Sequence, residues 1–331
     1  MNRFTYIRAD DVAGAVREIA KDGEAKFIAG GTNLIDLMKE NVERPSRLID
    51  ITRIALRDIQ PGPHGGLRLG ALATNTDVAY DKGVEHRYPI LSKAILAGAS
   101  PQLRNMATVG GNLMQRTRCC YFYDTATPCN KRTPGAGCSA IAGFNRAHAI
   151  LGTSGHCIAS HPSDMCVALA ALEAVVHVTG PGEERAIAFA DFHRLPGDTP
   201  NMDTNLRTGE IITAVDLPAK GFAEHYSYLK VRDRASYAFA LVSVAAALEM
   251  EGEKIKEARL ALGSVAHKPW RKQQVEKLLN GQSATRDTFQ RVAEALLHNA
   301  KGFGHNSFKI ELAKRAIVRG LSQAASGEGK P

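Results

Sequence analysis

Residues 26–34 read KFIAGGTNL, and this stretch decides how the N-terminal part of the chain folds. Its apolar start favours a short buried strand, and the two glycines that follow allow a tight turn into a helix. The backbone N–H groups of such a turn, beside a helix N-terminus, can bind a phosphate group. An ordinary strand–helix turn explains the same pattern, so this stretch alone leaves both interpretations open.

Residues 108–112, TVGGN, repeat the combination of a hydroxyl, two glycines and an amide. Two such turns are consistent with a long ligand that carries two phosphates. Neither is a Rossmann G-x-G-x-x-G fingerprint or a Walker A loop, so a nucleotide would be held in another way. A third candidate is Ser163 with Asp164, a helix N-cap by residue type, whose acid could accept hydrogen bonds from a ribose or ribityl hydroxyl.

The composition limits the class of protein. A chain of 331 residues can form two or three compact units, and 44% hydrophobic with 23% charged residues is ordinary for a globular protein. No apolar stretch is long enough to cross a bilayer, and the first residues lack the apolar segment of a secretory signal. We therefore expect no membrane insertion and no export signal in this chain.

Short strands and helices are expected to alternate in the first half, including a strand pair within residues 65–74. Strands are expected to predominate after about residue 204, and helices after Pro269. Breaks are indicated near residues 54–65 and 218–224. These two breaks divide the chain into three parts, residues 1–56, residues 57–220 and residues 221–325. A flexible tail of residues 326–331 is expected to follow.

The net charge of +8 is concentrated in two regions. Residues 101–150 contain six Lys and Arg against one acid, and residues 251–331 contain fifteen against eight. The C-terminal excess is best explained by solvated helix faces. A nucleic-acid surface is the alternative, but the region has no recognisable motif and few interleaved aromatic residues.

Six cysteines all lie between residues 119 and 166. Most fall in residues 115–158, a segment rich in Gly, Pro and Arg without periodicity, which is interpreted as an insertion. Their spacing matches no C-x-x-C motif, so spacing alone is a weak signal. Nearby basic residues would favour thiolates and offset the charge of an anionic iron–sulfur cluster. Reduced cysteines on a basic loop are the alternative interpretation.

Three ordered stretches together resemble one known family: AGGTNLIDLMK (29–39), QLRNMATVGGNL (102–113) and HPSDMCVALAALEAVV (161–176). They are similar to the FAD-binding subunits of the molybdenum hydroxylases, which include the medium subunit of carbon monoxide dehydrogenase and the flavin domain of xanthine dehydrogenase. The resemblance extends from about residue 4 to about residue 317. Within the family, residues 232–246 and 263–271 resemble the flavin subunits of bacterial periplasmic aldehyde oxidoreductases most.

The resemblance implies an α+β fold. An FAD-binding domain of the vanillyl-alcohol-oxidase (PCMH) type would be built from two α/β pieces, residues 1–56 and 57–220. A C-terminal domain with a three-stranded antiparallel sheet and helices would follow. The implied cofactor-binding residues are Lys26, Phe27, Ile28, Ala29, Gly30, Gly31, Thr32, Asn33, Leu34, Ala107, Thr108, Gly111, Asn112, Met114, Ser163, Asp164, Ile212 and Lys230. Of these, Ile212 would lie against the isoalloxazine, and Lys230 would approach the flavin from the C-terminal domain.

The resemblance also bears on the insertion. Most flavin subunits of the family lack it, but those of periplasmic aldehyde oxidoreductase and 4-hydroxybenzoyl-CoA reductase have one that holds a [4Fe–4S] cluster. The implied ligands are Cys119, Cys129, Cys138 and Cys157. Cys120 would be an ordinary neighbour, and Cys166 a core residue in a helix.

The implied function is that of an FAD- and [4Fe–4S]-containing electron-transfer subunit in a heterotrimer. No residue is predicted to catalyse chemistry of its own, because the chain has no Ser-His-Asp set and no H-E-x-x-H motif. A molybdenum–pterin subunit would oxidise the substrate, a [2Fe–2S] subunit would relay electrons to FAD, and an external acceptor, with an acidic ferredoxin-like protein as candidate, would receive them. A partner with an export signal would carry the chain to the periplasm, and without such a partner it would be cytoplasmic.

Three alternatives stay open at this point. The first is a 4-hydroxybenzoyl-CoA-reductase-like flavin subunit in which electrons flow inward. The second is a free-standing flavin oxidase or reductase, which would need a substrate base that the sequence does not identify. The third, from a different class, is an iron–sulfur regulator that binds nucleic acid through its basic C-terminal region.

Overall fold

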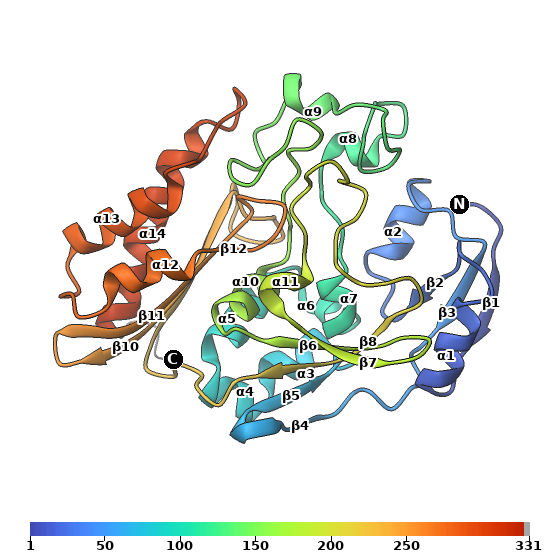
Figure 1. Cartoon of the computed structure of the whole chain (residues 1–331), viewed down its shortest axis with the longest axis horizontal. Coiled ribbons are helices and arrows are strands. Elements are labelled where there is room, and N and C mark those ends of the chain that lie inside the picture. Colours follow the sequence, from blue (N-terminus) through green and yellow to red (C-terminus); the bar gives the residue numbers. More distant parts are fainter. Residues whose placement is uncertain (328–331) are drawn as a thin grey trace.

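The computed structural model describes residues 1–327, in which helices pack around three β-sheets (Figure 1). The sheet of the N-terminal strands lies at one end of the molecule and the C-terminal helices lie at the other (Figure 1). Helix α14 ends at Ser326, and residues 328–331, the last part of the predicted tail, lie outside the described residues.

The first sheet has three parallel strands in the order β1 (Thr5–Arg8), β3 (Arg47–Asp50) and β2 (Lys26–Ile28). Helices α1 (Val12–Ile19) and α2 (Leu34–Lys39) connect them. Asp11 caps α1, accepting a hydrogen bond from the backbone N–H of Gly14 at 2.6 Å. The expected strand, glycine turn and helix after residue 26 are all present.

The second sheet has five antiparallel strands, in the order β4 (Ile59–Pro61), β5 (Leu67–Gly70), β8 (Ile211–Leu217), β6 (Val175–Thr179) and β7 (Glu184–Ala188). The expectation of a strand pair within residues 65–74 is wrong. Only β5 lies there, and its hairpin partner β4 precedes it. The backbone N–H of Ala73 bonds to the carbonyl of Gly70, and this turn leads into a helix instead of a second strand.

Helical segments accompany this sheet: η1 (Pro63–Gly65), α3 (Asn75–Tyr80), α4 (Lys82–Arg87), α5 (Pro89–Ala97), α6 (Pro101–Arg104), α7 (Val109–Leu113), α10 (Asp164–Ala171) and α11 (Phe189–Phe192). Thr74 begins α3 with a capping box, and Ser163 begins α10 by accepting from the backbone N–H of Cys166 at 3.0 Å. Every residue of α10 is buried. One apolar core contains residues of α10 together with residues of the second and third sheets, so α10 joins the two parts of the molecule.

The third sheet is antiparallel, in the order β12 (Trp270–Arg271), β11 (Lys254–Gly263), β10 (Val242–Glu251) and β9 (His225–Val231). Helices α12 (Gln273–Glu276), α13 (Arg286–Leu297) and α14 (Phe308–Ser326), with the short η2 (Lys277–Leu279), pack on it. The resemblance implied three strands. The sheet has these three long strands and a fourth of two residues, because the chain after Ala266 returns along β11 before α12 begins.

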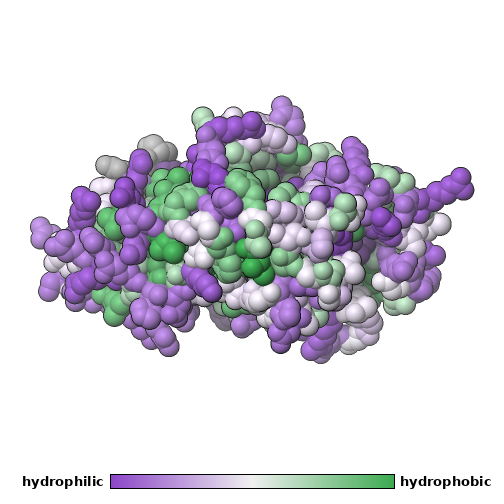
Figure 2. All heavy atoms as spheres, turned by 90° about the horizontal axis from the view of Figure 1, so that it is seen from above, coloured by the Kyte–Doolittle hydropathy of each residue, from purple (hydrophilic) through white to green (hydrophobic). Residues whose placement is uncertain are grey.

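Residues 115–158 form a loop-rich insertion above the second and third sheets (Figure 1). Its short helices are α8 (Cys120–Tyr123) and α9 (Ser139–Ala142). Figure 2 views the molecule from this side, where hydrophilic side chains dominate both ends and apolar ones gather near the middle. No helix within residues 1–327 is both long and apolar enough to span a bilayer.

Candidate functional site

The first glycine turn, after β2, is held tightly against the chain that precedes the second turn. Gly31 has a φ of +71°, in the left-handed region that favours glycine. A Cβ atom on Gly30 would lie 1.7 Å from the backbone oxygen of Met106. Glycine is therefore required at Gly30 for this close approach, which is a packing requirement in addition to any role in ligand binding.

The second turn lies between Thr108 and Asn112. The Thr108 hydroxyl accepts a hydrogen bond from the backbone N–H of Gly111 at 3.2 Å, and so caps α7. The Asn112 side-chain oxygen accepts a hydrogen bond of 2.5 Å from the Ser163 hydroxyl. The second turn and the third candidate, which are about 50 residues apart in sequence, are thus in direct contact.

Two cavities adjoin at these turns. The first, of ≈ 460 Å³, lies between the first sheet and the second. The second, of ≈ 390 Å³, extends toward the C-terminal sheet. Both are lined by Thr32, Asn33, Ala107 and Gly111. The arrangement is an elongated channel whose middle is made of the two glycine turns.

The structure brings the predicted cofactor-binding residues together. Each of the eighteen lines at least one of the two cavities. Ile212 lines the first cavity only, and Lys230 lines the second only. The two residues that were both expected near the flavin therefore line different cavities, and Ile212 lies beside Gly110 of the second glycine turn.

Asn33 is central to this channel. Its side-chain oxygen accepts a hydrogen bond from the backbone N–H of Arg116 at 2.9 Å. Its side-chain nitrogen is buried and has no hydrogen-bond partner. Buried polar groups are normally bonded, so a free amide donor between two cavities is fitted to a ligand acceptor.

A buried ion pair closes the second cavity on the side of the C-terminal sheet. Lys230 Nζ lies 2.7 Å from Asp164 Oδ2, and both side chains are less than a tenth exposed. The Tyr228 hydroxyl donates to Asp164 Oδ1 at 2.6 Å. Burial, and then the Asp164 carboxylate, raise the pKa of Tyr228 well above its ordinary value. The tyrosine therefore stays a hydrogen-bond donor.

Sequence reasoning missed several residues in or next to the second cavity. Tyr228, which bonds to the lining residue Asp164, could have been found, because it lies two residues before Lys230 on β9 and therefore faces the same side. Tyr237 and Phe239, which also line the cavity, lie on the loop between β9 and β10. Nothing in their local sequence distinguishes them from other surface aromatics.

The four predicted cysteine ligands surround one small cavity in the insertion. Cys119, Cys129, Cys138 and Cys157 all line it, and its volume is ≈ 10 Å³. Cys129 and Cys138 lie opposite each other in an antiparallel bridge. All six cysteines are free thiols.

The other two cysteines lie elsewhere. Cys120 is exposed and does not line the cavity, and Cys166 is buried in α10. Burial raises the pKa of the Cys119 thiol to about 12 and that of Cys157 to about 11. These thiols keep their protons unless cations replace them.

Hydrogen-bonding groups adjoin two of the cysteine sulfurs. His148 Nε2 lies 3.0 Å from Cys119 Sγ, and the backbone N–H of Ala159 points at Cys157 Sγ at 3.4 Å. Donors of this kind stabilise thiolates and tune metal sites. The basic residues that were noted around the cysteines in the sequence include Lys131, which lines the cavity.

A buried charge network fastens the insertion to the rest of the molecule. Lys131, whose side chain is 1% exposed, bonds to Asp203 and donates to the carbonyl of Pro200 at 2.8 Å. Arg116 lies 2.8 Å from Asp203 and 2.5 Å from Glu43. Burial alone would raise the pKa of Asp203, but Lys131 and Arg116 hold it well below its usual range.

Comparison with known proteins agrees with this architecture. Residues 2–220 match the family model described as FAD binding domain in molybdopterin dehydrogenase, and residues 226–324 match the CO dehydrogenase flavoprotein C-terminal domain. The aldehyde oxidoreductase FAD-binding subunit PaoB of Escherichia coli (strain K12) is 51% identical over 98% of this chain and 99% of its own.

More distant relatives share the whole length. The glyceraldehyde dehydrogenase medium chain of Sulfolobus acidocaldarius is 27% identical over 97% of this chain and 98% of its own. The crystal structure of quinoline 2-oxidoreductase from Pseudomonas putida 86 superposes with a TM-score of 0.76 at 25% identity, and covers 99% of both chains. From the matched family models and the near-complete PaoB alignment, we conclude that this chain belongs to the family of FAD-binding subunits of the molybdenum hydroxylases, which are oxidoreductase subunits.

Proposed function

We propose that this chain is the FAD-binding, electron-transfer subunit of a molybdenum-dependent aldehyde oxidoreductase. The observation that carries the proposal is the channel of two adjoining cavities with the glycine turns at its middle. The reaction type comes from the PaoB relative, which is named as an aldehyde oxidoreductase subunit. Bound FAD supplies chemistry that links one-electron and two-electron transfer, and the chain supplies its binding and orientation.

The glycine turns fit a pyrophosphate. Gly31 brings its backbone N–H group to the channel, and the unpartnered Asn33 amide adds a side-chain donor. Gly111 leaves room for the ligand beside them, because its own N–H is bonded to Thr108 and it has no side chain. Backbone donors at such turns favour anions. In this arrangement residues 26–34 and 107–112 hold the diphosphate between them.

The two ends of the ligand then occupy different cavities. We place the isoalloxazine in the second, where Tyr237 and Phe239 offer aromatic surface and Lys230 offers a positive charge held by Asp164. Ile212 then packs against the adenine end in the first cavity. In this placement Lys230 approaches the flavin, as expected from the sequence. Ile212, which was expected against the isoalloxazine, is instead proposed to contact the adenine.

We further propose that Cys119, Cys129, Cys138 and Cys157 bind a [4Fe–4S] cluster, although such a cluster is not general in this family. The support is that four thiols line one cavity, with Lys131 and N–H donors beside them. The cavity is only ≈ 10 Å³, so the loops that carry the cysteines must open to admit the cluster. Loops can open in this way more easily than helices or strands. When the cysteines bind the cluster as thiolates, they release the protons that the buried thiols hold.

The proposed partners follow from the same family membership. A molybdenum–pterin subunit and a [2Fe–2S] subunit would complete a heterotrimer, with electrons leaving through FAD to an external acceptor. Net positive charge in the insertion favours an acidic acceptor such as a ferredoxin-like protein, so its reduction rate should fall as salt rises. A signal-bearing partner would take the complex to the periplasm. Inward electron flow is the alternative for the same cofactors.

The experiment that tests the cofactors compares two cysteine variants of anaerobically purified protein. Cys129→Ser is expected to lose iron and sulfide while it keeps FAD, because the two sites are built from different residues. The matched control Cys120→Ser, at an exposed thiol, is expected to keep both. Loss of iron from Cys120→Ser only would contradict the ligand set, and wild-type protein without flavin would contradict the function.

A further inference from the structure

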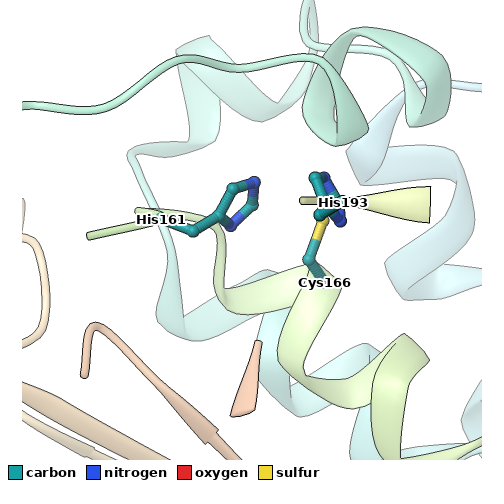
Figure 3. A group of neighbouring side chains, drawn as sticks. All are labelled: His161, Cys166 and His193. Carbon is teal, nitrogen blue, oxygen red and sulfur yellow. The ribbon is translucent and has the colours of Figure 1, made fainter. Parts of the chain in front are cut away.

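Three potential metal ligands meet in the interior at a place that none of the sites above uses (Figure 3). A ring nitrogen of His161, a ring nitrogen of His193 and Sγ of Cys166 all lie within 4.8 Å of one another. All three residues are buried, and none lines the FAD channel or the cysteine cavity. They come from three separate segments: the chain after the insertion, helix α10 and the loop after α11.

The two imidazoles have nitrogens without partners. His193 donates from Nε2 to the carbonyl of Leu113 at 2.9 Å, so its Nδ1 carries a lone pair and has no partner. Nε2 of His161 is also buried without a partner, and its Nδ1 lies 3.4 Å from the backbone nitrogen of Ser163. A metal on Nε2 would move the ring proton to Nδ1 and replace that contact. The rings pack edge to face, with centroids 4.4 Å apart, yet form no hydrogen bond to each other. Two buried, unpartnered nitrogens beside a thiol point to a bound group, because buried polar atoms are normally satisfied.

The donor set specifies the chemistry of that ligand. Two imidazoles and a thiol are typical ligands of zinc, whereas oxygen-seeking ions such as Mg²⁺ prefer carboxylates and water. A second bond from the far ring nitrogen to a backbone carbonyl, as in His193, is what orients a metal-binding histidine. We propose that His161, Cys166 and His193 bind one zinc ion.

Zinc binding would release one proton from the protein. Cys166 binds as the thiolate and releases its thiol proton to solvent, while both imidazoles bind as neutral ligands. The fourth position is left for a water molecule. The Asp203 carboxylate, whose charge acts on both histidines, offsets part of the added positive charge.

The position of the ion indicates a structural role. His161 follows Cys157 by four residues, so the ion would fix the end of the insertion. His193 bonds to Leu113, at the end of the second glycine turn, and Cys166 lies on α10, whose cap Ser163 bonds to Asn112. One ion would thus join the insertion, the FAD turn and the central helix. This inference does not depend on the proposed iron–sulfur cluster.

The first test needs no variant. The wild-type protein, expressed with zinc in the medium and purified without chelators or a metal-affinity step, is analysed for metals by mass spectrometry. We expect about one zinc per chain, and zinc-edge X-ray absorption with one sulfur at about 2.3 Å and the remaining ligands nitrogen or oxygen at about 2.0–2.1 Å. Protein without zinc, which would mean that a buried water fills the site, would overturn the proposal. So would three or four sulfur ligands, which would place zinc among the four cysteines of the insertion.

Variants provide the second test. Cys166→Ala and His193→Gln are each expected to lose at least nine-tenths of the zinc while they keep FAD and iron. Cys120→Ala, at the exposed neighbour in the insertion, is the matched control and should keep all three. Folded Cys166→Ala protein with an unchanged zinc content would overturn the assignment. If that variant fails to fold, the wild-type absorption spectrum decides the question.

Discussion

At the scale of single residues, adding one Cβ atom at Gly30 would change the shape of the channel. A Cβ there would lie 1.7 Å from the carbonyl oxygen of Met106, and that neighbour is backbone. In Gly30→Ala the two glycine turns must separate, which changes the shape of the channel between them. We expect FAD content, measured by absorbance of the purified complex, to fall at least tenfold.

The matched control for that change is Gly182→Ala. Gly182 lies in the turn between β6 and β7, outside the channel, and a Cβ there would meet nothing within 4 Å. It should keep its full flavin content and wild-type stability. Equal flavin in the two variants would mean that the contact between the turns is not needed for binding.

His267 gives the protein a predictable sensitivity to acid. Burial, and then the nearby Lys131 ammonium, lower the pKa of His267 to about 4, against about 6.5 in an unfolded chain. Between these values the unfolded state binds more protons, so stability falls as pH falls from 7 through 5 toward 4. This residue should account for ~2 kcal/mol of the stability lost between pH 7 and pH 5.

The check is to compare unfolding of wild type and His267→Gln at pH 7 and pH 5, by urea titration or by Tm. The variant should lose less stability than wild type over this interval, whatever its stability at pH 7. The other groups that act on His267, Asp203 and His193, stay in place in this comparison. An unchanged pH dependence would show that His267 is already protonated in the folded protein.

At the scale of elements, one acid pairs with two basic residues of the insertion. Asp203 bonds both Lys131, which is 1% exposed, and Arg116. Asp203→Asn removes the carboxylate that pairs with both Lys131 and Arg116. Removing one member of such a buried group lowers the free energy of unfolding by about 3–5 kcal/mol. We expect a lower Tm and partial loss of iron, because the displaced Lys131 lines the cysteine cavity.

A matched acid lies in the same loop. Asp198 is 95% exposed and contacts only His156, at 3.4 Å. Asp198→Asn should leave the Tm within about 1 °C of wild type, since exposed pairs contribute little. If both variants unfolded alike, the buried network would not be what fastens the insertion.

Some features of these elements could be predicted from the sequence, and others could not. The glycine turns and the cap Ser163 are local features, and the structure has them where they were expected. Lys131 and Asp203 are 72 residues apart, so no local pattern joins them. Only the family resemblance predicted that the four cysteines lie together. Their spacing alone was explained equally well by reduced cysteines on a basic loop.

At the scale of the whole molecule, the FAD channel is completed by the C-terminal sheet. Lys230 and Tyr228 on β9 meet Asp164 at the start of α10, and the same lysine donates to the carbonyl of Ala97 at 3.0 Å. The division of the chain near residues 218–224 was visible as a change in composition. That the later part reaches back into the site was implied only by the motif that carries Lys230.

The last prediction concerns this contact between the two parts. Lys230→Met leaves the Asp164 carboxylate buried with only Tyr228 as partner, which should destabilise the protein by about 3 kcal/mol. Adding Asp164→Asn removes the unpaired charge while Asn keeps an acceptor for Tyr228, so the double variant should be more stable than Lys230→Met alone. Both are measured by Tm, with FAD and after its removal. Strictly additive losses would mean that the two charges do not act as a pair, and that another contact joins the C-terminal sheet to the FAD-binding region.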